Sequence, residues 1–148
     1  MRNIHYITVD TGFWFALFNH EDAHHDEARD LWSAVKFKRI MLPWPSLYEA
    51  VNTQFAENRI WMRQFNAILK GLSADRFIND ETYRREAFQL TFEGYARRPL
   101  SLVDHVIRRM IADKNLRIDC LLTFDKKDFS DVCLENRVSI NLKSEYAR

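Results

Sequence analysis

Two acidic residues follow apolar stretches that have the character of buried β-strands. Asp10 ends the segment HYITVD, and Asp125 comes one residue after the apolar run IDCLLT. The carboxyl ends of parallel strands meet at one edge of a sheet, and ligands bind outside that edge. We therefore expect these two carboxylates to lie close together, where they could hold a metal ion or take part in acid–base chemistry.

Two more acids stand near predicted helix starts. Asp104 lies in the segment SLVD and borders the apolar stripe of the helix that follows, which would let its carboxylate look over the sheet edge. Glu49 lies in the segment SLYEAV, just past a short strand and the Pro43–Pro45 break.

Each acid also has a purely structural explanation. Asp10 could cap a helix that starts at residue 11, and Asp125 could cap a turn in the sequence DKKD. Asp104 fits the last position of a capping box, and Glu49 reads as a solvated helix residue. Taken one at a time, these explanations are favoured. Four clustered carboxylates would repel one another strongly, however, and a hard divalent cation such as Mg²⁺ or Mn²⁺ would relieve that repulsion.

The elements that must position these acids alternate along the chain. A short helical turn is predicted at 13–18, where the sequence is apolar. Helical periodicity and capping residues predict helices at 23–36, 45–59 and 61–71, from Asp80 through Gly94, and from Ser101 to about Asn115. Strands are predicted at 5–10, 39–42, 76–78, 118–123 and 138–140. This alternation is typical of a mostly parallel sheet with helices on both faces.

Composition excludes several classes of protein. The chain has 148 residues, a length that suits one domain over 1–148, and its net charge of +1 gives no global signal for nucleic-acid binding. With three glycines, it has neither a GxGxxG nor a GxxxxGK[ST] phosphate loop. No apolar run is long enough for a membrane span, and the N-terminal segment does not resemble a signal peptide, so we expect a cytoplasmic protein. Cys120 and Cys133 read as buried, unpaired side chains.

Three segments together resemble the PIN-domain family, of the kind found in VapC-type toxins of prokaryotic toxin–antitoxin pairs. They are VDTGFWFALFNHEDAHHDEA at 9–28, PSLYEA at 45–50 and LSLVDHVIRRMIADKNLRIDCLLTFDKKDF at 100–129. The last is the most specific, because it joins an LSxxD helix start, a helix, an apolar strand and TFDxxF at the family's spacing.

The resemblance implies an α/β/α sandwich of three layers around a sheet of about five strands, and a metal-dependent ribonuclease activity. The family's acidic site maps onto Asp10, Glu49, Asp104 and Asp125, which would be both catalytic and metal-binding. Asp128 is the alternative for the fourth acid, and Asp125 is preferred because it lies nearest the strand end. Thr11 and Thr123 match polar positions beside the first and fourth acids.

The corresponding mechanism uses Mg²⁺ or Mn²⁺ as cofactor. Asp10, Glu49 and Asp104 would hold one ion, while Asp125 would hold a second ion or orient the attacking water that cuts an RNA phosphodiester. The expected partners are an RNA substrate, a cognate antitoxin protein and a second copy of the chain in a homodimer, with no membrane. Four basic residues lie near these acids in the sequence and have two possible roles, contact with the RNA backbone or solvated surface: Arg108, Arg109, Lys126 and Lys127.

Other functions fit less well. A phosphatase of the haloacid-dehalogenase type would need a second acid where Gly12 stands, and a response-regulator receiver would need an acidic neighbour for Asp10. A non-catalytic RNA-binding or protein-interaction module on the same fold is the remaining alternative, and metal binding would distinguish it from the nuclease.

Overall fold

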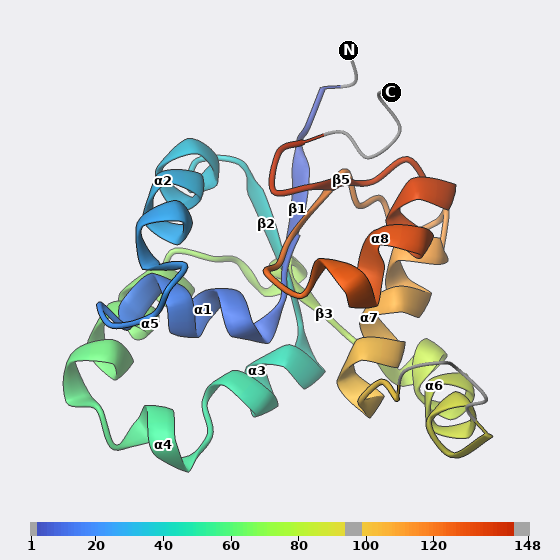
Figure 1. Cartoon of the computed structure of the whole chain (residues 1–148), viewed down its shortest axis with the longest axis horizontal. Coiled ribbons are helices and arrows are strands. Elements are labelled where there is room, and N and C mark those ends of the chain that lie inside the picture. The colour runs from blue at the N-terminus through green and yellow to red at the C-terminus, as the bar shows by residue number, and fades with distance from the viewer. Residues whose placement is uncertain (1–2, 94–98, 144–148) are drawn as a thin grey trace.

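The centre of the molecule is a five-stranded parallel sheet with strand order β3-β2-β1-β4-β5. The computed structural model describes residues 3–93 and 99–143 (Figure 1). The predicted α/β fold with a parallel sheet of about five strands is therefore confirmed. The strands are β1 (Tyr6–Val9), β2 (Arg39–Pro43), β3 (Phe77–Ile78), β4 (Cys120–Leu122) and β5 (Ser139–Ile140).

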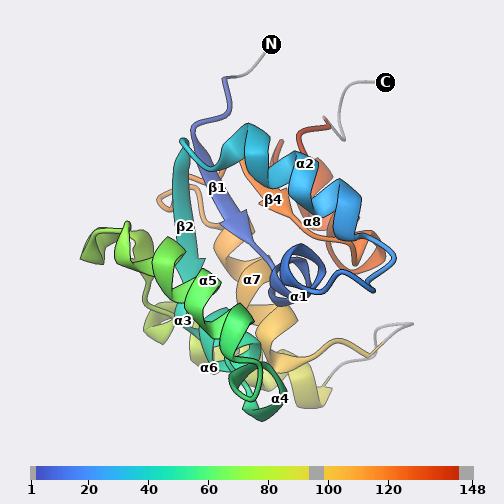
Figure 2. The ribbon, with the colours of Figure 1, turned by 90° about the vertical axis from the view of Figure 1, so that its left-hand side faces the viewer.

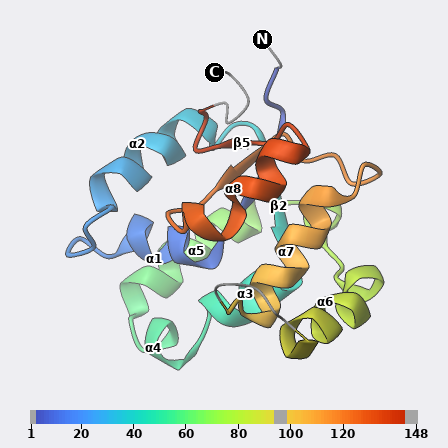
Figure 3. The same cartoon turned by 45° about the vertical axis from the view of Figure 1, so that its right-hand side comes forward.

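Helices cover both faces of this sheet and give a three-layer α/β/α sandwich. In Figure 1, α1, α2 and α5 lie on one side of the strands and α7 and α8 on the other; Figure 2 brings the first layer forward and Figure 3 the second. None of the described helices is long and apolar enough to cross a membrane. The helices are α1 (Thr11–Phe18), α2 (His25–Val35), α3 (Trp44–Ala50), α4 (Thr53–Ala56), α5 (Arg59–Lys70), α6 (Glu81–Glu93), α7 (Leu102–Ala112) and α8 (Lys126–Glu135), with a 3₁₀ turn at Ala74–Arg76.

The alternation of side chains along the strands divides the core into two halves. Ile7, Val9 and Leu122 pack against the α1, α2 and α5 layer, while Leu121 and Ile140 pack against α7 and α8. Because both faces of the sheet are covered, the central strands are buried on both sides, as is usual for parallel sheets. Both cysteines are buried in this core.

An aromatic cluster packs α1 against the other helices of its layer. The ring of Trp14 lies 4.7 Å from that of Phe65 on α5 and 5.4 Å from that of Trp32 on α2. Phe18 and Phe55 extend the cluster, with ring centroids 5.8 Å apart. Since α1 starts directly after β1, this packing also fixes the point at which the chain leaves the central strand.

A buried carboxylate holds the amino ends of the central strands. Asp119, which is 1% exposed, accepts hydrogen bonds from the backbone N–H groups of His5 and Tyr6 at 3.0 and 3.1 Å. Its own N–H donates to the carbonyl of Tyr6 at 2.9 Å. The entry to β1 is therefore tied to the residue that precedes β4.

Some predicted elements were wrong in extent. The helix predicted at 45–59 is two helices, because Asn52 accepts a hydrogen bond from the N–H of Phe55 and so starts α4. The predicted helix end near Asn115 lies instead at Ala112, and α8 was not predicted at all. Gly94, the predicted end of α6, lies outside the described residues.

We expect Phe65→Ala to destabilise the fold strongly, because Phe65 is the side chain of α5 that is buried in the core, with 1% exposure. Truncating a buried phenylalanine typically lowers the free energy of unfolding by about 3–5 kcal/mol. Urea unfolding followed by circular dichroism measures the change. Phe37→Ala is the matched control, since Phe37 is 89% exposed; equal losses in both variants would contradict this account of the core.

Candidate active site

Asp10 lies at the carboxyl end of β1 with both carboxylate oxygens engaged. Its Oδ1 accepts a hydrogen bond from the N–H of Thr11 at 2.8 Å, and its Oδ2 accepts one from the hydroxyl of Thr123 at 2.9 Å. Its backbone N–H donates to the carbonyl of Leu122 at 2.9 Å. The carboxylate is 3% exposed. Asp10 therefore caps α1, as predicted from the sequence in the structural explanation of this acid. It also contacts Thr123, the residue that follows β4.

Thr123 connects two of the predicted acids. Its hydroxyl oxygen accepts a hydrogen bond from the N–H of Asp125 at 3.0 Å while its hydroxyl proton goes to Asp10. The Asn141 side chain holds Thr123 from the other side, with its Oδ1 2.9 Å from the Thr123 nitrogen and its Nδ2 2.7 Å from the Thr123 carbonyl. Asn141 was missed from the sequence, although a lone polar residue after an apolar strand was a usable signal.

Asp104 lies in the first turn of α7, where its N–H donates the predicted capping hydrogen bond to the Ser101 hydroxyl oxygen at 3.1 Å. Burial raises the pKa of Asp104; the hydrogen bond with Ser101 opposes that rise, and the charges of Asp128 and Asp125 add to it. Asp104 therefore shares its surroundings with both alternatives for the fourth acid.

Burial likewise raises the pKa of Asp10, from 3.8 to about 7. The hydrogen bond from Thr123 opposes the rise, and the nearby negative charges of Asp104 and Asp125 reinforce it. Asp10, Asp104 and Asp125 are thus close enough to perturb one another, and a carboxylate at this position is costly to ionise unless a cation neutralises it.

The two alternatives for the fourth acid lie on either side of the α8 start. Asp125 is exposed, and a Cβ added at Gly12 would lie 3.8 Å from its Oδ2, so this carboxylate lies against the start of α1. Asp128 is 8% exposed in the first turn of α8. Asp125 stands at the N-cap position of α8 without a side-chain capping bond among the described residues, which leaves the structural explanation for this acid unsupported.

Glu49 comes from a third direction. The hydroxyl of Thr11 donates to the carbonyl of Ser46 at 3.4 Å, which joins the start of α1 to α3 one turn before Glu49. Glu49 is exposed and lines a groove of about 490 Å³ together with Leu102 and Val103 of α7. It therefore faces the turn of α7 that carries Asp104.

The donor set suits a hard divalent cation, since all its members are carboxylates around a buried acid whose negative charge is only partly compensated by its hydrogen bonds. As the side chains stand, no three His, Cys, Asp or Glu residues within 3–93 and 99–143 are arranged closely enough to hold a metal ion. Coordination by Asp10, Glu49 and Asp104 would therefore require rotation of exposed side chains, of which Glu49 is one.

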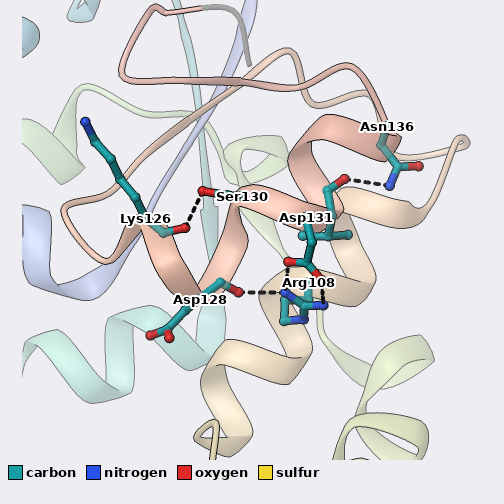
Figure 4. Close-up of polar contacts among 7 residues, drawn as sticks. Arg108, Lys126, Asp128, Ser130, Asp131 and Asn136 are labelled. Carbon is teal, nitrogen blue, oxygen red and sulfur yellow. Dashed lines mark hydrogen bonds and ion pairs between the residues drawn. The ribbon is translucent and has the colours of Figure 1, made fainter. Parts of the chain in front are cut away.

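Arginines near the acids are engaged with other partners. Arg108 forms two hydrogen bonds of 2.7 Å to the carboxylate of Asp131 and one of 2.6 Å to the carbonyl of Asp128. Figure 4 shows the Asp128 carboxylate pointing away from Arg108. Arg109 pairs with Glu86. Neither arginine offers its charge to the acidic cluster.

Aromatic stacking holds the loop between β4 and α8, a feature that the sequence did not reveal. Phe124 lies between Phe13 and His24, with ring centroids at 5.7 and 4.3 Å and planes nearly parallel to both. Because Phe124 separates Thr123 from Asp125, this stack fixes the backbone that carries the exposed acid.

We expect the metal-free protein to be more stable near pH 5 than near pH 8. The pKa of Asp10 is about 7 in the folded state and 3.8 without the fold, so its contribution is present at low pH and lost as the pH rises through that window. Over the whole interval between the two pKa values, the free energy of unfolding would fall by about 4 kcal/mol at most, and only part of this fall lies between pH 5 and pH 8. Asp10→Asn should flatten this pH dependence, as measured by urea unfolding in EDTA. Identical pH profiles for the two proteins would contradict the burial of this charge.

A comparison with solved structures finds a similar fold in VapC20 of Mycobacterium tuberculosis, described as a Sarcin-Ricin loop cleaving toxin. The match has a TM-score of 0.63 and 25% sequence identity, and it covers 82% of this chain and 92% of VapC20. No family model matches the chain. No curated protein matches it significantly. The likeness to VapC-type PIN-domain proteins that the sequence motifs predicted is thus confirmed by a structural match over most of the chain.

Proposed function

We propose that this chain is a Mg²⁺- or Mn²⁺-dependent endoribonuclease and the toxin of a type II toxin–antitoxin pair, acting in the cytoplasm. The observation that carries the proposal is the buried Asp10, whose pKa is raised to about 7 by burial and by Asp104 and Asp125. This cluster lies at the carboxyl ends of β1 and β4, where ligands of parallel sheets bind. The fold shared with VapC20, which cleaves an RNA loop, supports RNA as the substrate.

The residues have separate roles in this proposal. Asp10, Glu49 and Asp104 would hold the ion, and Asp125, or Asp128 in its place, would orient the attacking water or hold a second ion. The bound ion supplies neutralisation of phosphate charge and a more acidic water. Thr123 keeps Asp10 and Asp125 in register through its two hydrogen bonds, as polar partners of metal ligands commonly do.

Hydrolysis proceeds by attack of water on phosphorus with breakage of the P–O bond to the leaving nucleotide. The Asp125 carboxylate is exposed, and the backbone N–H of Asp125 donates to the Thr123 hydroxyl oxygen. In this proposal the carboxylate accepts a proton from the attacking water. No bond to the protein forms at any step. A cognate antitoxin and a homodimer belong to the proposal through the likeness to VapC20, and the neighbouring gene would identify the antitoxin.

We expect cleavage of labelled RNA with Mg²⁺ or Mn²⁺ and its loss in EDTA. Asp10→Asn and Asp104→Asn should each lower the rate by roughly 100-fold or more, because each removes a charge that an ion would need. The substrate panel should include a sarcin–ricin loop oligonucleotide and unrelated single-stranded RNA. Asp75→Asn is the matched control, since Asp75 is exposed and pairs with Arg39 at the far end of the sheet. Undiminished cutting in EDTA, or by both site variants, would contradict the mechanism.

Metal binding should be measurable without RNA. Titration calorimetry with Mn²⁺ at pH 8 should show binding that weakens as the pH falls below 7, because protons then compete for Asp10. Asp10→Asn should abolish most of the heat. A folded protein that binds no Mn²⁺ would favour the alternative, a non-catalytic RNA-binding or protein-interaction module on the same fold.

A further inference from the structure

A groove beside the acidic cluster is unused by the mechanism above. Its volume is about 490 Å³, and it runs between α3, α6 and α7. Glu49, a proposed metal ligand, is in its wall, and Leu102 and Val103 line it just before Asp104. The groove is therefore continuous with the place where a scissile phosphate would lie.

Tyr48 gives this groove an exposed aromatic surface. It is 78% exposed, whereas the neighbouring Trp44 is 43% exposed and stacks on Phe77 at 5.4 Å with a 28° angle between planes. The rings of Tyr48 and Trp44 lie 6.2 Å apart. Trp44 is thus held by the protein on one side, and Tyr48 presents its ring to solvent next to Glu49. Burying such a ring against a flat partner would be favourable.

The opposite wall carries a fixed cation. The Nε and Nη2 groups of Arg84 donate to the two carboxylate oxygens of Asp80 at 3.0 and 3.1 Å. The Asp80 side chain is 16% exposed and that of Arg84 61% exposed, so the aspartate anchors the guanidinium while the guanidinium faces solvent. A planar cation held in this way can contact a phosphate or the edge of a base.

One aromatic face, one anchored guanidinium and an apolar floor of Val103 and Val106 match a single nucleotide better than a peptide helix, which would need a longer apolar line. Base stacking on aromatic side chains is a common source of affinity for unpaired RNA. An unpaired nucleotide next to the scissile bond would enter this groove while its phosphate remained beside the acids.

We propose that this groove is a nucleotide subsite, in which an unpaired RNA base stacks on Tyr48 and Arg84 contacts the same nucleotide. The inference rests on the proposed ribonuclease function and adds to it the position and chemistry of one substrate contact. It also makes Tyr48 a determinant of which RNA is cut, because a base held in a duplex cannot enter the groove.

The test measures binding of a fluorescent single-stranded RNA to the full chain carrying Asp10→Asn, in EDTA, so that no cleavage intervenes. Adding Tyr48→Ala should weaken binding about tenfold, the scale of one base stack. Tyr48→Phe and Tyr48→Trp should retain the affinity, since each keeps a ring, and duplex RNA should bind more weakly than single-stranded RNA. Phe37→Ala removes an even more exposed ring elsewhere and should change nothing.

Trp44 offers a second readout, because a base stacked on Tyr48 would lie near its indole and quench its fluorescence. The quenching should disappear in Tyr48→Ala and persist in Tyr48→Phe. Unchanged RNA affinity in Tyr48→Ala, or a loss shared by Tyr48→Phe, overturns the subsite. If Mg²⁺-dependent cleavage is nevertheless found with the unmodified chain, the subsite alone has failed; if cleavage is also absent, the proposed function has failed with it.

Discussion

The structure depends on one buried carboxylate that must satisfy several partners at once. Asp10 ends β1, caps α1 through the N–H of Thr11 and receives the hydroxyl of Thr123 from the strand next to it. These two hydrogen bonds favour the ionised form of Asp10, whereas burial and the charges of two neighbouring acids disfavour it. The fold thus holds a carboxylate between α1, β4 and α7, in a place where its negative charge is only partly compensated.

The capping role of Asp10 is therefore compatible with the catalytic role proposed for it. A cap needs an oxygen at a helix start, and the start of α1 lies at the carboxyl edge of the sheet where substrates approach. Asp104 likewise lies at a helix start: its N–H donates to the Ser101 hydroxyl oxygen, and the charges of Asp125 and Asp128 raise the pKa of its carboxyl group. A helix start beside a strand end supplies backbone geometry that fixes an acid at the edge of the sheet where ligands bind. The structural explanation of Asp10 therefore does not compete with its proposed role.

The sequence was sufficient for features that depend on local pattern and failed for those that depend on distant contacts. Composition and spacing were enough to predict the parallel sheet, the burial of its strands on both faces, and the Ser101 cap. The break at Asn52 is also local, but its capping role was hidden inside an apolar line that continues to Phe55. Asn141 stood out in the sequence only as a polar residue after an apolar strand, because its role lies in two hydrogen bonds to Thr123, 18 residues away. The groove at Tyr48 required three helices to be placed first.

The buried Asp119 at the amino edge has a consequence for the opposite edge. It ties the entry of β1 to β4, while Asp10 and Thr123 tie the exit of the same two strands. A one-residue slip of β1 would turn every side chain of the strand to the other face, and both carboxylates would lose their partners together. The short strand β1 is thus held by side-chain hydrogen bonds at both ends, so a change of register would have to break both sets together. A substitution of Asp119 would therefore misalign the acids at the carboxyl edge, although no residue near them is altered.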